Sequence, residues 1–122
     1  MAYDNQNIFA KILRGEIPCT KVLETAHTLA FRDINPARPV HVLVIPKGPY
    51  VTWGDFAAQA SPAEQADFVR AIGEVARLEG IAASGYRLLQ NNGDHGHQEV
   101  PHMHVHVVGG ASAGPMLRRM EG

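Results

Sequence analysis

The chain has 122 residues, of which 45% are hydrophobic and 19% are charged. This length and composition are those of one globular domain, and they exclude a wholly disordered chain, a collagen and a coiled coil. Eleven Lys and Arg residues against twelve Asp and Glu residues leave a formal net charge of −1. Because non-specific binding to nucleic acid needs an excess of basic side chains, we expect no nucleic-acid partner.

Cysteine content and targeting signals narrow the class of protein further. The single cysteine, Cys19, excludes an internal disulfide and a zinc site built from several cysteines. Residues 1–7 contain Asp4 and no basic stretch ahead of an apolar run, so no signal peptide is expected. No window approaches the length of an apolar membrane span. We therefore expect a cytoplasmic protein without a membrane partner.

The first part of the chain predicts a short helix and three strands. Asn7 can cap a helix over residues 7–14, because apolar residues recur on one face after it. Strands are expected at residues 20–25, 28–33 and 40–45, where β-branched and aromatic residues gather between turn signals.

A long helix is predicted to begin at Ser61. Ser61 and Glu64 can form a capping box around Pro62, and the helix should run to about Glu79, where Gly80 can end it. Its expected apolar face consists of Phe68, Val69, Ile72, Val75 and Ala76.

Two more strands are expected at residues 86–90 and 103–108, separated by a long polar loop. Loops of this kind often carry function. The order of elements predicts an α+β fold with a mainly antiparallel sheet, one long helix and one short helix. We expect a single domain over residues 1–110 and an irregular tail over residues 111–122.

Histidine is the unusual residue type, with seven in the chain and five of them between positions 95 and 106. His102, His104 and His106 alternate with Met103, Val105 and Val107. Side chains on a strand alternate between its two faces, so the three imidazoles should share one face while the apolar residues pack on the other.

Such a row permits two kinds of chemistry. Neutral imidazole can attack phosphorus and carry protons, while neighbouring rings donate hydrogen bonds to phosphate oxygens. Alternatively, two rings of the row and one further ligand could hold a metal ion. The candidate further ligands are His41, Asp94, His95, His97 and Glu99.

The sequence resembles the histidine triad (HIT) superfamily, and within it the HINT branch. The likeness rests on His-x-His-x-His at residues 102–106 and on the closing Val-Gly-Gly at residues 108–110. It extends to Asn-Ile-Phe-Ala-Lys-Ile-Leu-Arg-Gly-Glu-Ile-Pro at residues 7–18, Pro-Val-His-Val-Leu-Val-Ile-Pro-Lys at residues 39–47, and Gly-His-Gln-Glu-Val-Pro-His at residues 96–102.

The resemblance implies a five-stranded antiparallel sheet and a homodimer with one continuous ten-stranded sheet. It implies hydrolysis of purine nucleoside 5′-phosphoramidates, such as adenosine 5′-monophosphoramidate, to a nucleoside monophosphate such as AMP. No cofactor and no metal are implied. The expected ligand is thus a purine nucleoside monophosphate-type small molecule.

The resemblance also implies roles for single residues. His104 matches the nucleophile that forms a nucleotidyl-histidine, His106 a phosphate donor, and His102 and His41 supporting histidines. The expected substrate-binding residues are Ile8, Phe9, Phe31, Asp33, Ile34, Asn91, His97, Gln98 and Glu99.

This sequence departs from the family pattern at two of these positions. His97 stands where members often have Gly, and Glu99 stands where some have a Ser that protonates the leaving group. Two other functions stay open on sequence alone: a histidine-based metalloprotein, and a nucleotide-binding regulatory protein with weak catalysis.

Overall fold

The computed structural model describes residues 2–118 and 120 and contains one five-stranded sheet. The strands are β1 (Lys21–Glu24), β2 (Thr28–Arg32), β3 (Val40–Pro46), β4 (Tyr86–Leu89) and β5 (Val105–Gly109). They lie in the order β1-β2-β3-β5-β4, and every neighbouring pair is antiparallel. The predicted α+β class with an antiparallel sheet is confirmed.

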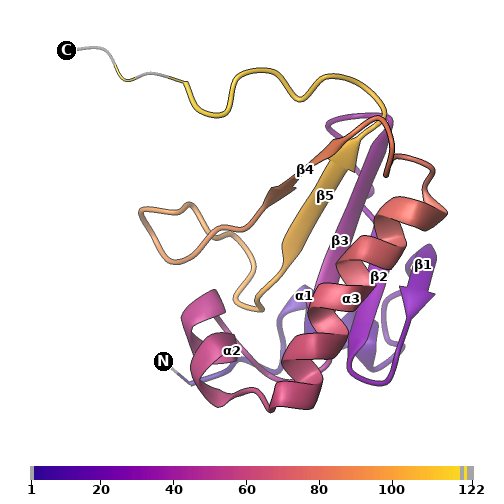
Figure 1. Cartoon of the computed structure of the whole chain (residues 1–122). Helices are drawn as coiled ribbons and strands as arrows, with labels where there is room; N and C mark the ends of the chain where they lie inside the picture. The colour runs from indigo at the N-terminus through magenta and orange to yellow at the C-terminus, as the bar shows by residue number, and fades with distance from the viewer. Residues whose placement is uncertain (1, 119, 121–122) are drawn as a thin grey trace.

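Three helices accompany the sheet: α1 (Ile8–Leu13), α2 (Trp53–Gln59) and α3 (Pro62–Leu78). Helix α3 lies across one face of the sheet, while α1 lies behind the strands in the same view (Figure 1). None of the described helices combines the length and the apolar character needed to cross a membrane.

Helix α3 begins and ends where the sequence predicts. Ser61 and Glu64 form the complete capping box, and Gly80 adopts a left-handed φ of 73° after the helix. Phe68 and Val75 are fully buried. The prediction that Val69 faces the core is wrong, because Val69 is 65% exposed. Adjacent helical residues point about 100° apart, so Val69 turns away from the sheet when Phe68 points into it.

Helix α2 was not predicted, and its ends show why it forms. Thr52 caps it and makes a capping box with Asp55, which stabilises a helix of only seven residues. Phe56 packs against Phe68 of α3 and against Tyr50, with ring centroids 5.1 Å and 5.3 Å apart. This tertiary packing compensates for the weak helix propensity of Gly54.

The sheet has two buried faces with different contents. The face under α3 contains Val42 and Val44 from β3 together with Met103, Val105 and Val107. The opposite face contains Leu43 and Ile45 from β3 with Leu29 and Phe31 from β2, and Phe9 of α1 covers it. The alternation predicted for residues 102–107 therefore holds, and the imidazoles lie on the α1 side.

Strand β5 begins at Val105 rather than at the predicted Met103. The backbone amide of Met103 donates to the carbonyl of Tyr50 instead of to a neighbouring strand. This contact brings the start of the histidine row against the segment that follows β3.

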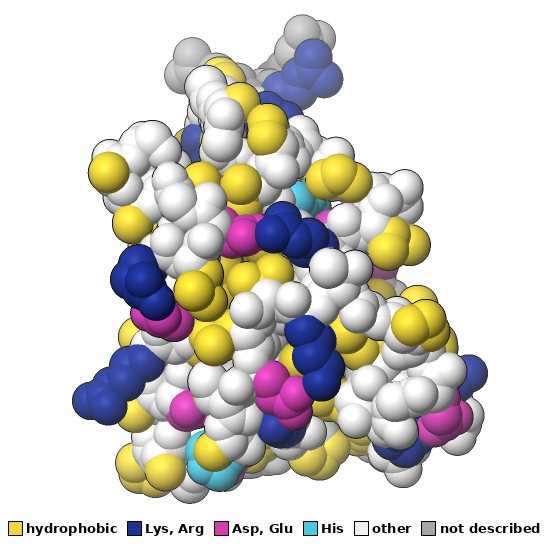
Figure 2. Space-filling model, turned by 90° about the vertical axis from the view of Figure 1, so that its right-hand side faces the viewer, with side chains coloured by type: hydrophobic (Ala, Val, Ile, Leu, Met, Phe, Trp, Pro, Cys, Tyr) yellow, Lys and Arg dark blue, Asp and Glu magenta, His cyan; other side chains and the backbone are white. Residues whose placement is uncertain are grey.

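Charged side chains of opposite sign lie next to one another on the face shown in Figure 2, and no basic patch forms there. The ion pairs among the described residues include Arg32 with Glu79 and Arg77 with Glu74. On this face, as in the sequence as a whole, acidic and basic side chains occur together and neither sign dominates.

Candidate active site

His104 and His106 line a cavity of about 220 Å³ on the α1 side of the sheet. Their ring centroids are 5.1 Å apart. We call this space the triad cavity; its other lining residues are Asp33, Leu43, Asn91, His97, Glu99 and Val100. Residues from β3, from β5 and from the two connections β2–β3 and β4–β5 therefore meet at one place.

His102 does not line this cavity, because its side chain is buried among protein groups. Its Nε2 lies 2.8 Å from the carbonyl oxygen of Pro46 and its Nδ1 lies 2.5 Å from the hydroxyl of Tyr3. A carbonyl only accepts, so Nε2 carries the proton and Nδ1 accepts from Tyr3. Burial lowers the pKa of His102 to about 4, which keeps the ring neutral at pH 7.

His104 receives its orientation from the backbone of His102. Its Nδ1 lies 2.7 Å from the carbonyl oxygen of His102. Because a carbonyl oxygen only accepts, Nδ1 carries the proton and donates a hydrogen bond to this oxygen. Burial lowers the pKa of His104 as well. The neutral ring therefore holds its lone pair on Nε2, as a nucleophile requires.

A second chain of hydrogen bonds fixes His106. The amide of Ala37 donates to Nδ1 of His41 at 3.0 Å, and Nε2 of His41 lies 2.9 Å from Nδ1 of His106. His41 must then donate from Nε2, which leaves the proton of His106 on its own Nε2. Burial, together with the charges of His104 and His41, lowers the pKa of His106 to about 4.

Asp33 follows β2 and lies beside these rings. One carboxylate oxygen is 3.5 Å from Nε2 of His41, and the other accepts the amide of Asn35. Asp33, His41 and His106 offer three ligand atoms within 4.8 Å of one another, which is the metal-capable group found among the described residues. It differs from the predicted combination of two triad histidines with a loop ligand. An ion there would have to break the His41–His106 hydrogen bond.

The sequence matches the HIT domain family model over residues 14–113. The chain belongs to the HIT domain family. A relative named as an uncharacterized 13.2 kDa HIT-like protein, from Azospirillum brasilense, is 60% identical over 117 residues, which are 96% of each chain. The purine nucleoside phosphoramidase of Escherichia coli K12 is 43% identical over 112 residues, covering 92% of this chain and 93% of the relative.

Solved structures show the same relationship. The HIT family hydrolase of Legionella pneumophila Philadelphia 1 is 41% identical, with a TM-score of 0.80 and coverage of 86% of this chain and 93% of that chain. The resemblance of this sequence to the histidine triad superfamily is thereby confirmed. The hydrogen-bonded histidines described above therefore belong to a HIT domain.

The loop between β4 and β5 brings Asn91, His97 and Glu99 into the triad cavity of the HIT domain, but not Gln98. The side-chain nitrogen of Gln98 donates to the carbonyls of Val51 and Val100, and its oxygen accepts the amide of Gly93. Both ends of this amide group thus hold the loop in place. A substrate contact of Gln98 stays a prediction.

The four apolar residues among the expected substrate-binding residues divide into two pairs. Phe9 and Phe31 are buried with ring centroids 5.6 Å apart, and Phe9 also stands edge-on to His104 at 5.0 Å. Ile8 is 45% exposed and Ile34 is 90% exposed. The exposed pair is accessible to a ligand, whereas Phe9 packs against both Phe31 and the ring of His104.

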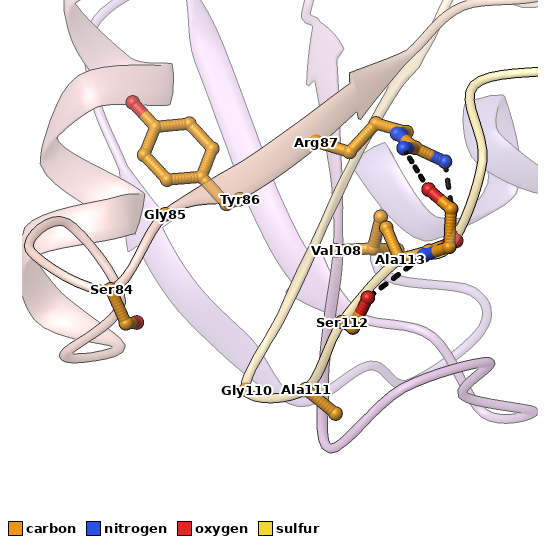
Figure 3. A pocket seen from close by; sticks show the side chains of 10 residues that line it. Ser84, Gly85, Tyr86, Arg87, Val108, Gly110, Ala111, Ser112 and Ala113 are labelled. Atoms are coloured by element: carbon orange, nitrogen blue, oxygen red, sulfur yellow. Dashed lines mark hydrogen bonds between the residues drawn. The ribbon is translucent and has the colours of Figure 1, made fainter.

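Two arginines hold the tail next to the site. Arg87 donates to the carbonyls of Ala113 and Gly114, and these three residues line a cavity of about 510 Å³ (Figure 3). Arg87 also donates to the carbonyl of Pro115, and Arg38 donates to the carbonyl of Ser112. The described residues 111–118 and 120 form neither helix nor strand.

Sequence reasoning missed Tyr3 and the amide of Ala37, although each fixes a histidine proton. Tyr3 is 99 residues from His102 in the chain, and a backbone amide has no signature in sequence. Neither contact follows a helical or strand period, so no local pattern could have indicated them.

Proposed function

We propose that this HIT domain hydrolyses purine nucleoside 5′-phosphoramidates through a covalent nucleotidyl-histidine on His104. The observation that carries the proposal is the proton arrangement of the triad: Nε2 of His104 holds a lone pair while Nε2 of His106 holds a proton. A nucleophile and a hydrogen-bond donor then stand side by side in one cavity, as attack on a phosphoryl group requires.

The proposed reaction has two displacement steps. Nε2 of His104 forms a bond to phosphorus, and the P–N bond breaks with its electron pair going to the amine nitrogen. Nε2 of His106 donates to a non-bridging oxygen and stabilises the charge that gathers there. Water then attacks the nucleotidyl-histidine, releasing the nucleoside monophosphate and restoring neutral His104.

The substrate class is supported by the Escherichia coli relative, which is named a purine nucleoside phosphoramidase. Asp33 lies in the triad cavity with a carboxylate that can accept hydrogen bonds from ribose hydroxyls. We assign Asn91 to the phosphate and the exposed Ile8 and Ile34 to the base.

Replacing His104 by Asn tests the mechanism. Asn keeps a polar side chain of similar size but cannot form the covalent bond, so turnover should fall by about three orders of magnitude or more while AMP still binds. Early quenching of wild-type protein with adenosine phosphoramidate should yield a nucleotide adduct on the peptide containing residues 102–106, detected by mass spectrometry. His27→Asn, in the turn between β1 and β2, is the matched control and should keep full activity.

Two alternatives give different results in the same assays. A metalloprotein using Asp33, His41 and His106 loses activity when chelators remove its metal, whereas the proposed enzyme stays fully active. A nucleotide-binding regulatory protein binds AMP but turns over no phosphoramidate. Retention of full activity by His104→Asn would refute the covalent mechanism itself.

A further inference from the structure

The histidine protons described above leave one requirement of the proposed reaction unmet. His104 contributes a lone pair, and the proton of His106 is directed to a phosphoryl oxygen. His102 and His41 already use both ring nitrogens in hydrogen bonds. A departing alkylamine must take up a proton, because the amine anion is too basic to leave, and none of these four rings has one available for it.

His97 has the backbone conformation that points to a further role. Its φ is 61°, and it is the one non-glycine residue with positive φ among the described residues. Glycine adopts this conformation without strain, whereas other residues are uncommon there. The loop holds it in place, since the His97 amide donates to the carbonyl of Asp94 and the Gln98 amide donates to that of Gly93. Strain that the surroundings enforce in this way occurs preferentially at functional sites.

The His97 side chain lies at the edge of the triad cavity. It lines the triad cavity with His104 and His106, yet it is 86% exposed and therefore stands at the mouth. Its Nε2 is 3.4 Å from a carboxylate oxygen of Glu99, which lines the same cavity.

Other charged and titratable groups reach the same space. Asp33, His104 and His106 line the cavity, and the charges of Asp33 and Glu99 raise the pKa of His104 against the larger lowering caused by burial. Glu99 therefore acts electrostatically on His104 and lies beside His97. Asp33 lies next to His41.

We propose that His97, whose Nε2 faces the carboxylate of Glu99, is the acid that delivers a proton to the leaving amine; this inference rests on the proposed function. As Nε2 of His104 bonds to phosphorus, the P–N bond breaks, its electron pair stays on nitrogen, and the His97 proton moves to that nitrogen. A neutral amine leaves and His97 becomes neutral. In the second step His97 accepts a proton from the attacking water and returns to its starting state.

His97→Gly is the decisive variant because glycine suits the left-handed backbone at this position and the loop keeps its shape. His97→Asn, another residue tolerated there, serves as a second variant with a polar but non-titrating side chain. Each is assayed with an alkylamine phosphoramidate of adenosine and with the nitrophenyl ester of AMP, whose leaving group departs without a proton.

Both variants should lose about 100-fold in kcat/KM on the alkylamine substrate and stay within about twofold of wild type on the nitrophenyl ester. Glu99→Gln should show the same selective loss to a smaller degree.

Equal losses on both substrates, or no loss on either, overturn the role of His97. These results differ from failure of the proposed function, which is seen when wild-type protein cleaves neither substrate or when His104→Asn cleaves the nitrophenyl ester as well as wild type does.

Discussion

Two hydrogen-bond chains decide which nitrogen of each histidine carries its proton. One runs from Tyr3 through the His102 ring to the Pro46 carbonyl, and the His102 carbonyl then orients His104. The other runs from the Ala37 amide through His41 to His106. Because an imidazole is a nucleophile on one nitrogen and a donor on the other, these partners determine what each ring can do.

Replacing Tyr3 by Phe removes one oxygen atom and so tests the hydrogen bond from Tyr3 to His102. The variant keeps the edge-on ring packing against His102 but removes the donor to Nδ1, leaving that nitrogen unsatisfied in a buried side chain. The free energy of unfolding should fall by about 1–3 kcal/mol, measured by urea denaturation. The imidazole nitrogen resonances of His102 should also change, because its tautomer is no longer fixed from both sides.

Tyr86→Phe is the matched control for that experiment. Tyr86 is 41% exposed in the single chain, and its hydroxyl has no hydrogen-bond partner among the described residues, so unfolding of the chain should be unchanged. If Tyr3→Phe and Tyr86→Phe unfold alike and the His102 resonances stay the same, Tyr3 does not fix the ring.

At the scale of elements, β4 is an edge strand with exposed apolar side chains. It forms one edge of the sheet, pairing with β5 on one side only. Leu88 and Leu89 are 48% and 43% exposed, and together with Trp53 they line a groove of about 320 Å³. Exposed apolar edge strands are sites of strand pairing. We propose that β4 pairs with β4 of a second copy, in the homodimer that the resemblance to HINT proteins implies.

Leu88→Glu should convert this dimer into a monomer, since a charged side chain at the join cannot be buried without a partner. Sedimentation at several protein concentrations measures the change. Leu117→Glu makes the same substitution in the tail, where Leu117 is 85% exposed, and should leave the dimer intact. A wild-type chain that sediments as a monomer contradicts the pairing of β4.

For the whole molecule, the buried imidazoles couple folding to pH. Burial lowers the pKa of both His102 and His106 to about 4, below the ordinary value of about 6.5 that they regain on unfolding. Between these values the unfolded chain binds protons that the folded chain excludes. The stabilisation is therefore complete above pH 6.5 and is lost as the pH falls towards 4.

The free energy of unfolding should decrease from pH 6.5 to pH 4.5, with a slope of up to about 1.4 kcal/mol per pH unit from His102 alone. The less buried His106 adds a smaller amount. The carboxyls of Glu64 and Asp67 have lowered pKa values and titrate below this window. Urea denaturation at pH 7.5, 6.0 and 5.0 measures the slope, and equal midpoints at the three values would contradict it.

Interactions between residues close together in the sequence determined several features of this protein. The alternation at residues 102–107 placed the imidazoles on one face, because side chains on an extended chain alternate. The capping box at Ser61 determined where α3 begins, since its hydrogen bonds form within four residues. The motifs around the histidines identified the HIT family, which the comparisons confirmed.

Only the tertiary structure decided the state of each histidine. The partners of His102 lie 99 and 56 residues away, and that of His106 lies 65 residues away. Tertiary packing also decided two other features. Helix α2 depends on the packing of Phe56 against Phe68, and the way α3 packs on the sheet leaves Val69 exposed. A sequence pattern reports which face a residue occupies, whereas a hydrogen bond to a distant atom exists only once the chain has folded.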